Sequence, residues 1–325
     1  MSSLRFNNAY INSSFSIAGP EERLGKIKNF DLTFDDYYFN EKTFEKAEIR
    51  MQRIAINRLL ALINKKANDI DLLISGDLSN QIANSSYATK YFDIPYLGIY
   101  SACATFCESL IIAATFLDNK QLKNIIAVTS SHNLTAEKEF RFPIEYGSPK
   151  KQTSTNTATG CVSTFISSNK STIKIESATI GRIVDLDIKD PNHFGAAMAP
   201  AAADTIYNHL KDLDRKPSYY DLILTGDLGK YGSKLLLKYL KINNDIILNN
   251  HMDAGTEVFC DSQNKNAGSS GPVTIPLVFF NKLLKEKKYK RILLVATGAL
   301  HSPLLLNQKE SIPAISHAVS IEVIR

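Results

Sequence analysis

Cysteine is scarce in this chain, and long hydrophobic runs are absent. The 325 residues include four cysteines, at positions 103, 107, 161 and 260, and their spacing matches neither a zinc site nor a disulfide framework. The longest clean apolar stretch, at 110–117, is far shorter than the roughly 20 residues that a membrane span needs. Asn and Ser interrupt residues 1–20, so no secretory signal is indicated. We therefore expect the chain to reside inside the cell, in a reducing compartment.

A strong charge of one sign is also lacking. Lys and Arg number 38 against 33 Asp and Glu, which gives a net charge of +5 and a pI near 8.8. The basic residues are dispersed apart from a short run at 285–291, which is typical of a solvated helix end. No helix-turn-helix, zinc-finger or aromatic RNA-binding motif accompanies them, so we expect no nucleic-acid partner. The mild positive charge favours anionic partners.

The most informative pattern is an internal repeat. The segment DLLISGDL at 71–78 recurs as DLILTGDL at 221–228, with five identities in eight positions and an offset of 150. A second pair of segments, 103–130 and 270–297, aligns without a gap at an offset of 167. The sequence therefore predicts two halves of one design.

Each half alternates helical and strand patterns. Apolar residues at helical spacing over 44–62 and 206–213 precede the two repeated strands, and a second helical face precedes the strands at 125–130 and 292–297. Continuous apolar strands suit a sheet that is buried on both faces, which predicts an α/β fold with a largely parallel sheet. Two such β-α-β halves are expected to pack as a five-layer αβαβα sandwich.

The boundary between the halves is predicted near Lys189. Residues 140–159 are polar and rich in turn formers, which indicates a long excursion. The segments 161–168 and 172–186 are interpreted as a strand pair that closes the first half. We expect halves at 1–189 and 190–325 that share one core.

A duplicated β-α-β design with a cysteine at the start of a central helix resembles the thiolase and ketoacyl-synthase superfamily. A closer resemblance, to the stage V sporulation protein AD family, extends over almost the whole chain. The segments that carry it are SGDLSNQ (75–81), YSACATFCES (100–109), TSSHNLTAEKEFRFPIEYG (129–147), AMAPAAADTI (197–206), LTGDLGKYGS (224–233) and VATGALHSPLLLNQKESIPAISHAV (295–319).

The resemblance implies a non-catalytic subunit that binds dipicolinic acid, in the machinery that moves this compound into the developing spore and releases it in germination. The implied partners are dipicolinic acid, alone or as its calcium chelate, and the other membrane subunits of that machinery, with a homodimer formed through the first-half sheet edge. The implied location is peripheral to the inner membrane of the forespore and spore. No cofactor is implied. Two alternatives stay open, an acyl-transfer enzyme that uses Cys103 and a structural scaffold for membrane partners.

The candidate nucleophile lacks the expected catalytic neighbours. Cys103 is predicted in the first turn of its helix, where backbone amides and the helix dipole stabilise a thiolate or a bound anion. Condensing relatives carry a histidine where this chain offers Asp227, and residues 267–270 contain neither His nor Asn. His132 and His301 follow paired strands and are the remaining histidine candidates. Cys103 has the alternative of a small thiol that only fills space.

A binding role needs fewer groups than catalysis. The predicted ligand-binding residues are Cys103, His132, Arg141, Asp77, Asp227, Ser270 and His301. Cys103 and the GSSG turn at 268–271 supply two helix starts, and Arg141 and the two histidines supply cationic donors. The two aspartates orient these donors or meet calcium carried by the ligand. The alternatives are an ordinary ion pair for Arg141 and turn capping for the aspartates. We expect no metal site of the protein's own.

Overall fold

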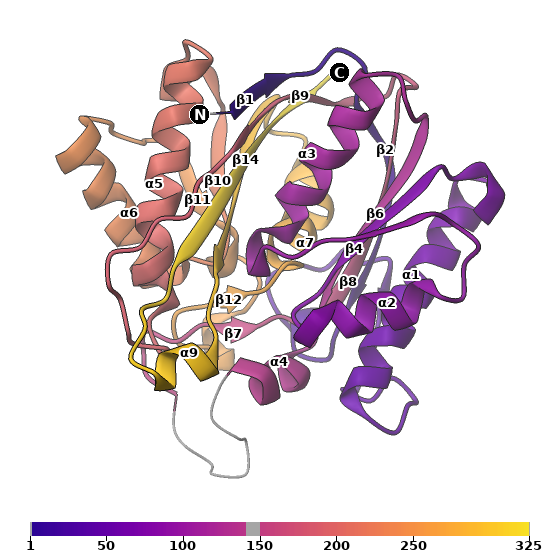
Figure 1. The fold of residues 1–325 in the computed structure, drawn as a ribbon, viewed down its shortest axis with the longest axis horizontal. Helices are drawn as coiled ribbons and strands as arrows, with labels where there is room; N and C mark the ends of the chain where they lie inside the picture. The colour runs from indigo at the N-terminus through magenta and orange to yellow at the C-terminus, as the bar shows by residue number, and fades with distance from the viewer. Residues whose placement is uncertain (1, 141–149, 325) are drawn as a thin grey trace.

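The structure is a computed structural model that describes residues 2–140 and 150–324. One sheet runs through the molecule in the order β11-β10-β13-β14-β9-β2-β8-β6-β4-β5, with β1 paired to β9 and β3 to β2 (Figure 1). The strands are β1 (Ser2–Arg5), β2 (Tyr10–Ala18), β3 (Leu32–Thr33), β4 (Leu72–Gly76), β5 (Tyr96–Gly98), β6 (Asn124–Ser131), β8 (Gly160–Ser167), β9 (Ile173–Ile180), β10 (Leu222–Thr225), β11 (His251–Asp253), β13 (Arg291–Ala299) and β14 (Ala314–Val323). Two short strands, β7 (Asn156–Thr157) and β12 (Ser269–Ser270), form a separate pair.

Helices cover both faces of each half of the sheet. They are α1 (Phe44–Leu62), α2 (Ala83–Thr89), α3 (Thr105–Asp118), α4 (Asn133–Phe140), α5 (Phe194–Asp212), α6 (Gly229–Asn244), α7 (Thr274–Val278), α8 (Leu284–Glu286) and α9 (Pro303–Asn307), and a π-helical turn, η9 (Phe279–Leu283), joins α7 to α8. In Figure 1, α3 and α7 lie between the two halves of the sheet, α1 and α2 lie outside one half, and α5 and α6 lie outside the other.

Three large hydrophobic clusters fill the spaces between these layers. The central cluster packs α3 against α7 and η9, where the rings of Phe106 and Phe280 lie 6.2 Å apart. A second cluster lies between α5, α6 and the adjoining strands, and a third lies under α1 around Met51 and Leu59. The predicted five-layer sandwich is therefore confirmed, with helix layers outside, between and outside the two parts of the sheet.

The repeat predicted from the sequence matches the placement of the elements. Helices α1 and α5 each span 19 residues and begin 150 residues apart. Strands β6 and β13 begin 167 residues apart, at Asn124 and Arg291. Helical periodicity marks the whole of α1 because one face of that helix is buried against the sheet. For α5 it marks only the last part, since residues 197–203 are all buried and show no periodic pattern.

The prediction of a largely parallel sheet was wrong. Strand β4 runs parallel to β5 and β6, and β10 runs parallel to β11 and β13, but β8 is antiparallel to β2 and β6, and β14 is antiparallel to β9 and β13. Every residue of β8 is buried. Between two helix layers a strand is covered on both faces whatever its direction, so a continuous apolar run does not report parallel pairing here.

The expected strand pair within 161–186 was also wrong. Strand β8 lies between β2 and β6, whereas β9 pairs with β1 and β14 and meets β2 only at Tyr10 and Ile11. Its partner β14 comes much later in the chain, and such a long-range contact is not encoded in local pattern. The division of the chain at residue 189 stays a prediction.

None of the helices in the described ranges, 2–140 and 150–324, is both long and apolar enough to cross a membrane.

We predict that Leu110→Ala, in the central helix α3, destabilises the protein by about 2–5 kcal/mol, because it empties a fully buried site that neighbours refill only in part. The matched control is Leu62→Ala at the end of α1, where the leucine is 62% exposed and the expected change is within about 0.5 kcal/mol. Urea unfolding followed by circular dichroism measures both. Equal destabilisation by the two variants would contradict a single core centred on α3.

Candidate functional site

Cys103 lies in a tight turn between the edge strand β5 and the central helix α3. The turn is a 3-10 segment, Ala102–Ala104, and Ala102 has a left-handed backbone with φ 50°. The amide of Ala104 donates to the carbonyl of Ser101 at 2.9 Å. A Cβ atom at Gly298, on β13, would collide with that same carbonyl, so only glycine lets the turn approach the other half so closely. Cys103 is therefore held in the 3-10 turn directly before α3, whose first residue is Thr105, rather than in the first turn of that helix, and it is half-buried.

Ser270 lies on the facing turn, which the first half holds in place. Strand β12, which contains Ser270, pairs in parallel with β7. The hydroxyl of Thr155 donates to Ser270 Oγ at 2.9 Å, and the amide of Ala158 donates to the carbonyl of Ser270 at 2.8 Å. The expectation of a helix start at Ser270 was wrong, because α7 begins at Thr274 and the preceding residues extend to form the β7–β12 pair.

Cys103, Ser270 and His301 line one cavity. Its other walls are largely apolar and aromatic and are formed by Leu78, Tyr100, Ala102, Ala136, Phe140, Thr157, Phe194, Met198 and Ala299. The cavity volume is about 30 Å³, which is enough for about one water molecule. The two repeat-related turns therefore meet, but the space between them is small.

A larger groove of about 400 Å³ adjoins this cavity. Leu78, Tyr100, Phe140 and His301 line both spaces, and the groove is completed by residues 79–82, Glu139, Ser302 and Pro303. Two consecutive groove residues, Gln81 and Ile82, have left-handed backbones with φ 58° and 49°. An isoleucine in this region is strained, so the groove wall is held by its surroundings rather than by local preference.

His301 joins the cavity to the end of α4. Its Nε2 lies 3.1 Å from the carbonyl oxygen of Phe140, and its ring lies 5.3 Å from that of Phe194. The side chain is buried. Of the two histidine candidates, this one lies at the same cavity as Cys103.

His132 does not line the cavity. Its Nε2 lies 2.8 Å from the carbonyl oxygen of Tyr37, and its ring stacks on Phe44 at 5.4 Å. Burial lowers the pKa of His132 to about 4, so the ring is neutral near pH 7 and is not a cationic donor. Aromatic packing in the first half accounts for this residue.

Asp77 is fully buried and caps a turn. Its Oδ1 accepts from the amide of Ser79 at 2.7 Å and from the Ser79 hydroxyl, and its Oδ2 accepts from the amide of Ser85 at 2.7 Å. These bonds match the capping alternative and leave Asp77 away from the cavity walls. Arg141 lies outside the described residues.

Asp227, at the repeat-related position, is also fully buried but is bonded differently. Its Oδ1 accepts from the amide of Gly271 at 2.7 Å. Burial, and then the neighbouring Asp253, raise the pKa of Asp227 well above its ordinary value. Asp227 does not line the cavity. Within the described residues no group of three or more His, Cys, Asp or Glu side chains is arranged to hold a metal ion.

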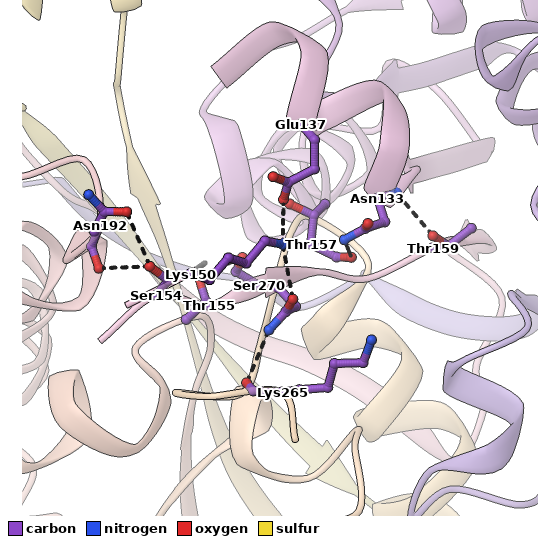
Figure 2. A network of polar contacts seen from close by, with 11 residues as sticks. Asn133, Glu137, Lys150, Ser154, Thr155, Thr157, Thr159, Asn192, Lys265 and Ser270 are labelled. Atoms are coloured by element: carbon purple, nitrogen blue, oxygen red, sulfur yellow. Dashed lines mark hydrogen bonds and ion pairs between the residues drawn. The ribbon is translucent and has the colours of Figure 1, made fainter. Parts of the chain in front are cut away.

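Figure 2 shows a polar network beside the cavity that the sequence interpretation missed. The ammonium group of Lys150 lies 2.8 Å from Glu137 Oε1 on α4 and 3.1 Å from Asn156 Oδ1 on β7. The amide of Asn156 continues to the carbonyl oxygen of Lys265 in the second half at 3.1 Å. The network spans both halves, and neither spacing nor repeat marks Lys150 in the sequence.

Two aromatic walls, Tyr100 and Phe140, were missed as well. Tyr100 precedes Cys103 by three residues and is 42% exposed, a position from which it lines both the cavity and the groove. Proximity to the cysteine was the available signal for Tyr100. Phe140 comes from the end of α4, which packs through Ala136 against Ala102 and Leu78, a tertiary contact that sequence spacing does not show.

The family model of stage V sporulation protein AD matches residues 2–322. The chain is 43% identical over 317 residues to stage V sporulation protein AD of Bacillus subtilis (strain 168). The aligned region covers 96% of this chain and 94% of that protein.

Two solved structures share the fold. A single-residue variant of OleA from Xanthomonas campestris, bound with cerulenin, has a TM-score of 0.64 and 16% identity, covering 98% of this chain and 97% of that one. The 3-oxoacyl-(acyl carrier protein) synthase III of Xanthomonas oryzae pv. oryzae has a TM-score of 0.62 and 14% identity, covering 98% of this chain and 99% of that one. At these identities the likeness shows a thiolase-like fold alone. The match over nearly the whole length shows more: the chain belongs to the stage V sporulation protein AD family.

Proposed function

We propose that this protein is a non-catalytic subunit that binds dipicolinic acid within the machinery that takes up this compound in sporulation and releases it in germination. The observation that carries the proposal is the cavity between the two repeat-related turns, where the half-buried Cys103 and the hydroxyl of Ser270 meet aromatic walls. A flat aromatic dicarboxylate needs such a combination of apolar slot and few polar groups. Membership of a sporulation protein family supports the biological setting.

The size of the two spaces indicates how the ligand fits. The inner cavity holds about one water molecule, so the pyridine ring lies in the adjoining groove, against Tyr100, Phe140 and His301. One carboxylate points inward to Ser270 and the turn at Cys103, where helix-start amides favour an anion. Glu139 lies on the groove wall and would repel the other carboxylate. Calcium bound to the ligand removes that repulsion, so the chelate is the favoured form.

The residue at the position of the catalytic histidine, Asp227, supports a binding role rather than catalysis. Asp227 stands where condensing relatives carry histidine, and its carboxyl group is turned into the core to accept from Gly271. It neither lines the cavity nor carries the two ring nitrogens that relay protons in a histidine. A thiol without a positioned base and oxyanion hole is a poor condensing catalyst.

A second candidate function, acyl transfer through Cys103, is favoured by one observation. His301 lines the same cavity as Cys103, and a histidine beside a thiol is the usual means of activating it. The small inner cavity argues against an acyl chain bound there, because it has room for little more than a water molecule.

The proposed location is peripheral to the inner membrane of the forespore and spore. The membrane subunits of the same machinery would hold the protein there and receive the ligand. The net charge of +5 adds a modest attraction to anionic lipid headgroups.

A homodimer through strand β5 is proposed as the assembly. This strand forms one end of the sheet, and all three of its residues are exposed. Its own residues Tyr96 and Leu97, and Tyr87, Tyr91 and Tyr100 from the adjoining segments, are large exposed side chains. An exposed edge strand with apolar neighbours is a ready pairing surface. Pairing of two copies along β5 would cover it.

We predict that the protein binds dipicolinic acid. Isothermal titration calorimetry is expected to show one site per chain, tighter with calcium present. Tyr100→Ala and Ser270→Ala are each expected to weaken binding by about tenfold, the effect of losing one stacking or hydrogen-bonding contact. Cys103→Ala tests the inner cavity in the same assay, with Cys260→Ala as its matched control, since Cys260 is also partly exposed but lies elsewhere. Unchanged affinity in the three cavity variants would remove the ligand from this location.

Acyl transfer is predicted to be absent. Incubation with acyl-coenzyme A should leave the intact mass of the protein unchanged, because Asp227 takes the place of the histidine that condensing relatives carry and is turned away from the cavity. A stable acyl adduct on Cys103, lost in His301→Gln, would instead establish the enzyme alternative.

We predict that the protein is a dimer in solution, so that light scattering coupled to size-exclusion chromatography gives the mass of two chains. Leu97→Glu, on β5, should shift the population to monomers because a buried unpaired carboxylate is costly. Leu304→Glu, on the short helix α9 and 68% exposed, is the matched control that should stay dimeric. Monomeric wild-type protein at high concentration would refute the assembly.

A further inference from the structure

Asp227 is a buried acid whose bonding does not suit a charge. Its Oδ2 is out of contact with solvent and has no hydrogen-bond partner among the described residues. Burial and Asp253 raise its pKa, while the Gly271 amide and the Thr274 hydroxyl oppose the shift less strongly. A fully buried carboxylate with so few donors loses more hydration than it regains. The favoured state of Asp227 is therefore the neutral acid.

Its neighbour Asp253 is bonded in the opposite manner. Asp253 accepts from four donors: the Thr225 hydroxyl at 2.7 Å and the amides of Leu228, Gly229 and Gly255 at 3.3, 2.9 and 3.0 Å. Burial raises the pKa of Asp253 to about 7, against the effect of those donors. Donors favour the ionised form, so of the two carboxyl groups Asp253 is the one that carries a negative charge as pH rises. That charge disfavours ionisation of Asp227 further.

The other groups that face this pair are neutral near pH 7. From α3, the thiol of Cys107 lies near Asp227, and burial raises its pKa to about 12. From β11, His251 Nε2 lies 2.8 Å from the Thr225 hydroxyl that serves Asp253, and burial lowers the pKa of His251 to about 4. Neither supplies a cation to balance a second negative charge.

The amide that donates a hydrogen bond to Asp227 belongs to the turn that carries Ser270. Gly271 follows Ser270 directly, has φ 115°, and lies so close to Ser131 and Thr157 of the first half that a side chain there would collide with them. The first half fixes the turn from one side through the β7–β12 pair and the bond between Thr155 and Ser270, two residues that Figure 2 shows. Asp227 fixes it from the other side.

We propose that Asp227 is a positioning residue for the cavity: its buried carboxyl group accepts a hydrogen bond from the Gly271 amide, clamps the 268–271 turn and thereby directs Ser270 to the cavity. This role replaces the one that histidine has at the same place in condensing relatives. The inference rests on the proposed function only in taking the cavity as the ligand site, and the clamp itself is testable without ligand.

The pH dependence of stability distinguishes a neutral clamp from an ordinary buried carboxylate. Because the folded protein raises the pKa of Asp227 above its ordinary 3.8, the stability it contributes is full below that value and is lost as pH rises through the folded pKa. Asp227→Asn keeps an acceptor for the Gly271 amide and removes the titration. The difference in melting temperature between variant and wild type should therefore move in favour of the variant as pH rises from about 5 to about 9.

Asp253→Asn is the matched comparison in the same unfolding series. Its amide nitrogen would face groups that donate, so a loss of several degrees in melting temperature is expected. A variant Asp227→Asn that is as unstable as Asp253→Asn, or whose difference from wild type does not change with pH, would overturn the neutral clamp.

The rate at which Cys103 is alkylated measures how firmly the facing turn covers the cavity. At one fixed pH, the rate of iodoacetamide labelling of the Cys103 peptide should rise several-fold in Asp227→Ala, because the facing turn loosens, and should stay at the wild-type value in Asp227→Asn. Equal rates in all three proteins would refute the positioning role. If wild-type protein fails to bind dipicolinic acid while both results hold, the proposed function is wrong and the clamp stands. If Asp227→Ala does not fold, the pH series with Asp227→Asn decides.

Discussion

The site depends on the packing of α3 against α7 and η9 in the central layer. This contact, centred on Phe106 and Phe280, fixes the distance between the two halves of the sheet. The turns that precede the two helices are thereby brought face to face, with Cys103 on one and Ser270 on the other. At Gly298 and Gly271 the absence of a side chain lets each turn approach the opposite half. The cavity is a consequence of the duplication, since neither half could enclose it alone.

The buried acids show how the repeated scaffold diverged. Asp77 and Asp227 follow repeat-related strands, yet Asp77 is saturated by donors from Ser79 and Ser85, whereas Asp227 receives the amide of Gly271. The first carboxyl group stabilises a turn within its own half. The second reaches the turn that lines the shared cavity. The same residue type at the same place in the repeat thus serves local structure in one half and the site in the other.

Much of the fold was predictable because the duplication and the helical periodicity are both visible in the sequence itself. The offsets of 150 and 167 predicted the repeated strands, and helical periodicity predicted helices over 44–62 and 206–213, which correspond to α1 and to the end of α5. Strand direction and the partner of β9 were not predictable, since burial on both faces gives β8 the pattern of a parallel strand and β9 pairs with strands far away in sequence. At the site, three of the residues singled out in the sequence, Cys103, Ser270 and His301, line one cavity, and their role in ligand binding stays a prediction. Tyr100 was missed although it lies close to Cys103 in the sequence, and Lys150 was missed because its contacts with Glu137 and Asn156 are tertiary and follow no motif or repeat.

The dimensions of the two spaces bear on which of the proposed functions suits this thiolase-like scaffold. A condensing enzyme must admit its substrate to the cysteine, and here the space beside Cys103 holds about one water molecule. The adjoining groove, bounded by the strained residues Gln81 and Ile82, has kept enough room for a flat aromatic ring. Chemistry requires the substrate to reach the sulfur, but recognition requires only that one anionic group reach the turn amides and Ser270. Under the proposed function, a scaffold with a closed inner space and an open outer groove would lose catalysis and still bind its ligand.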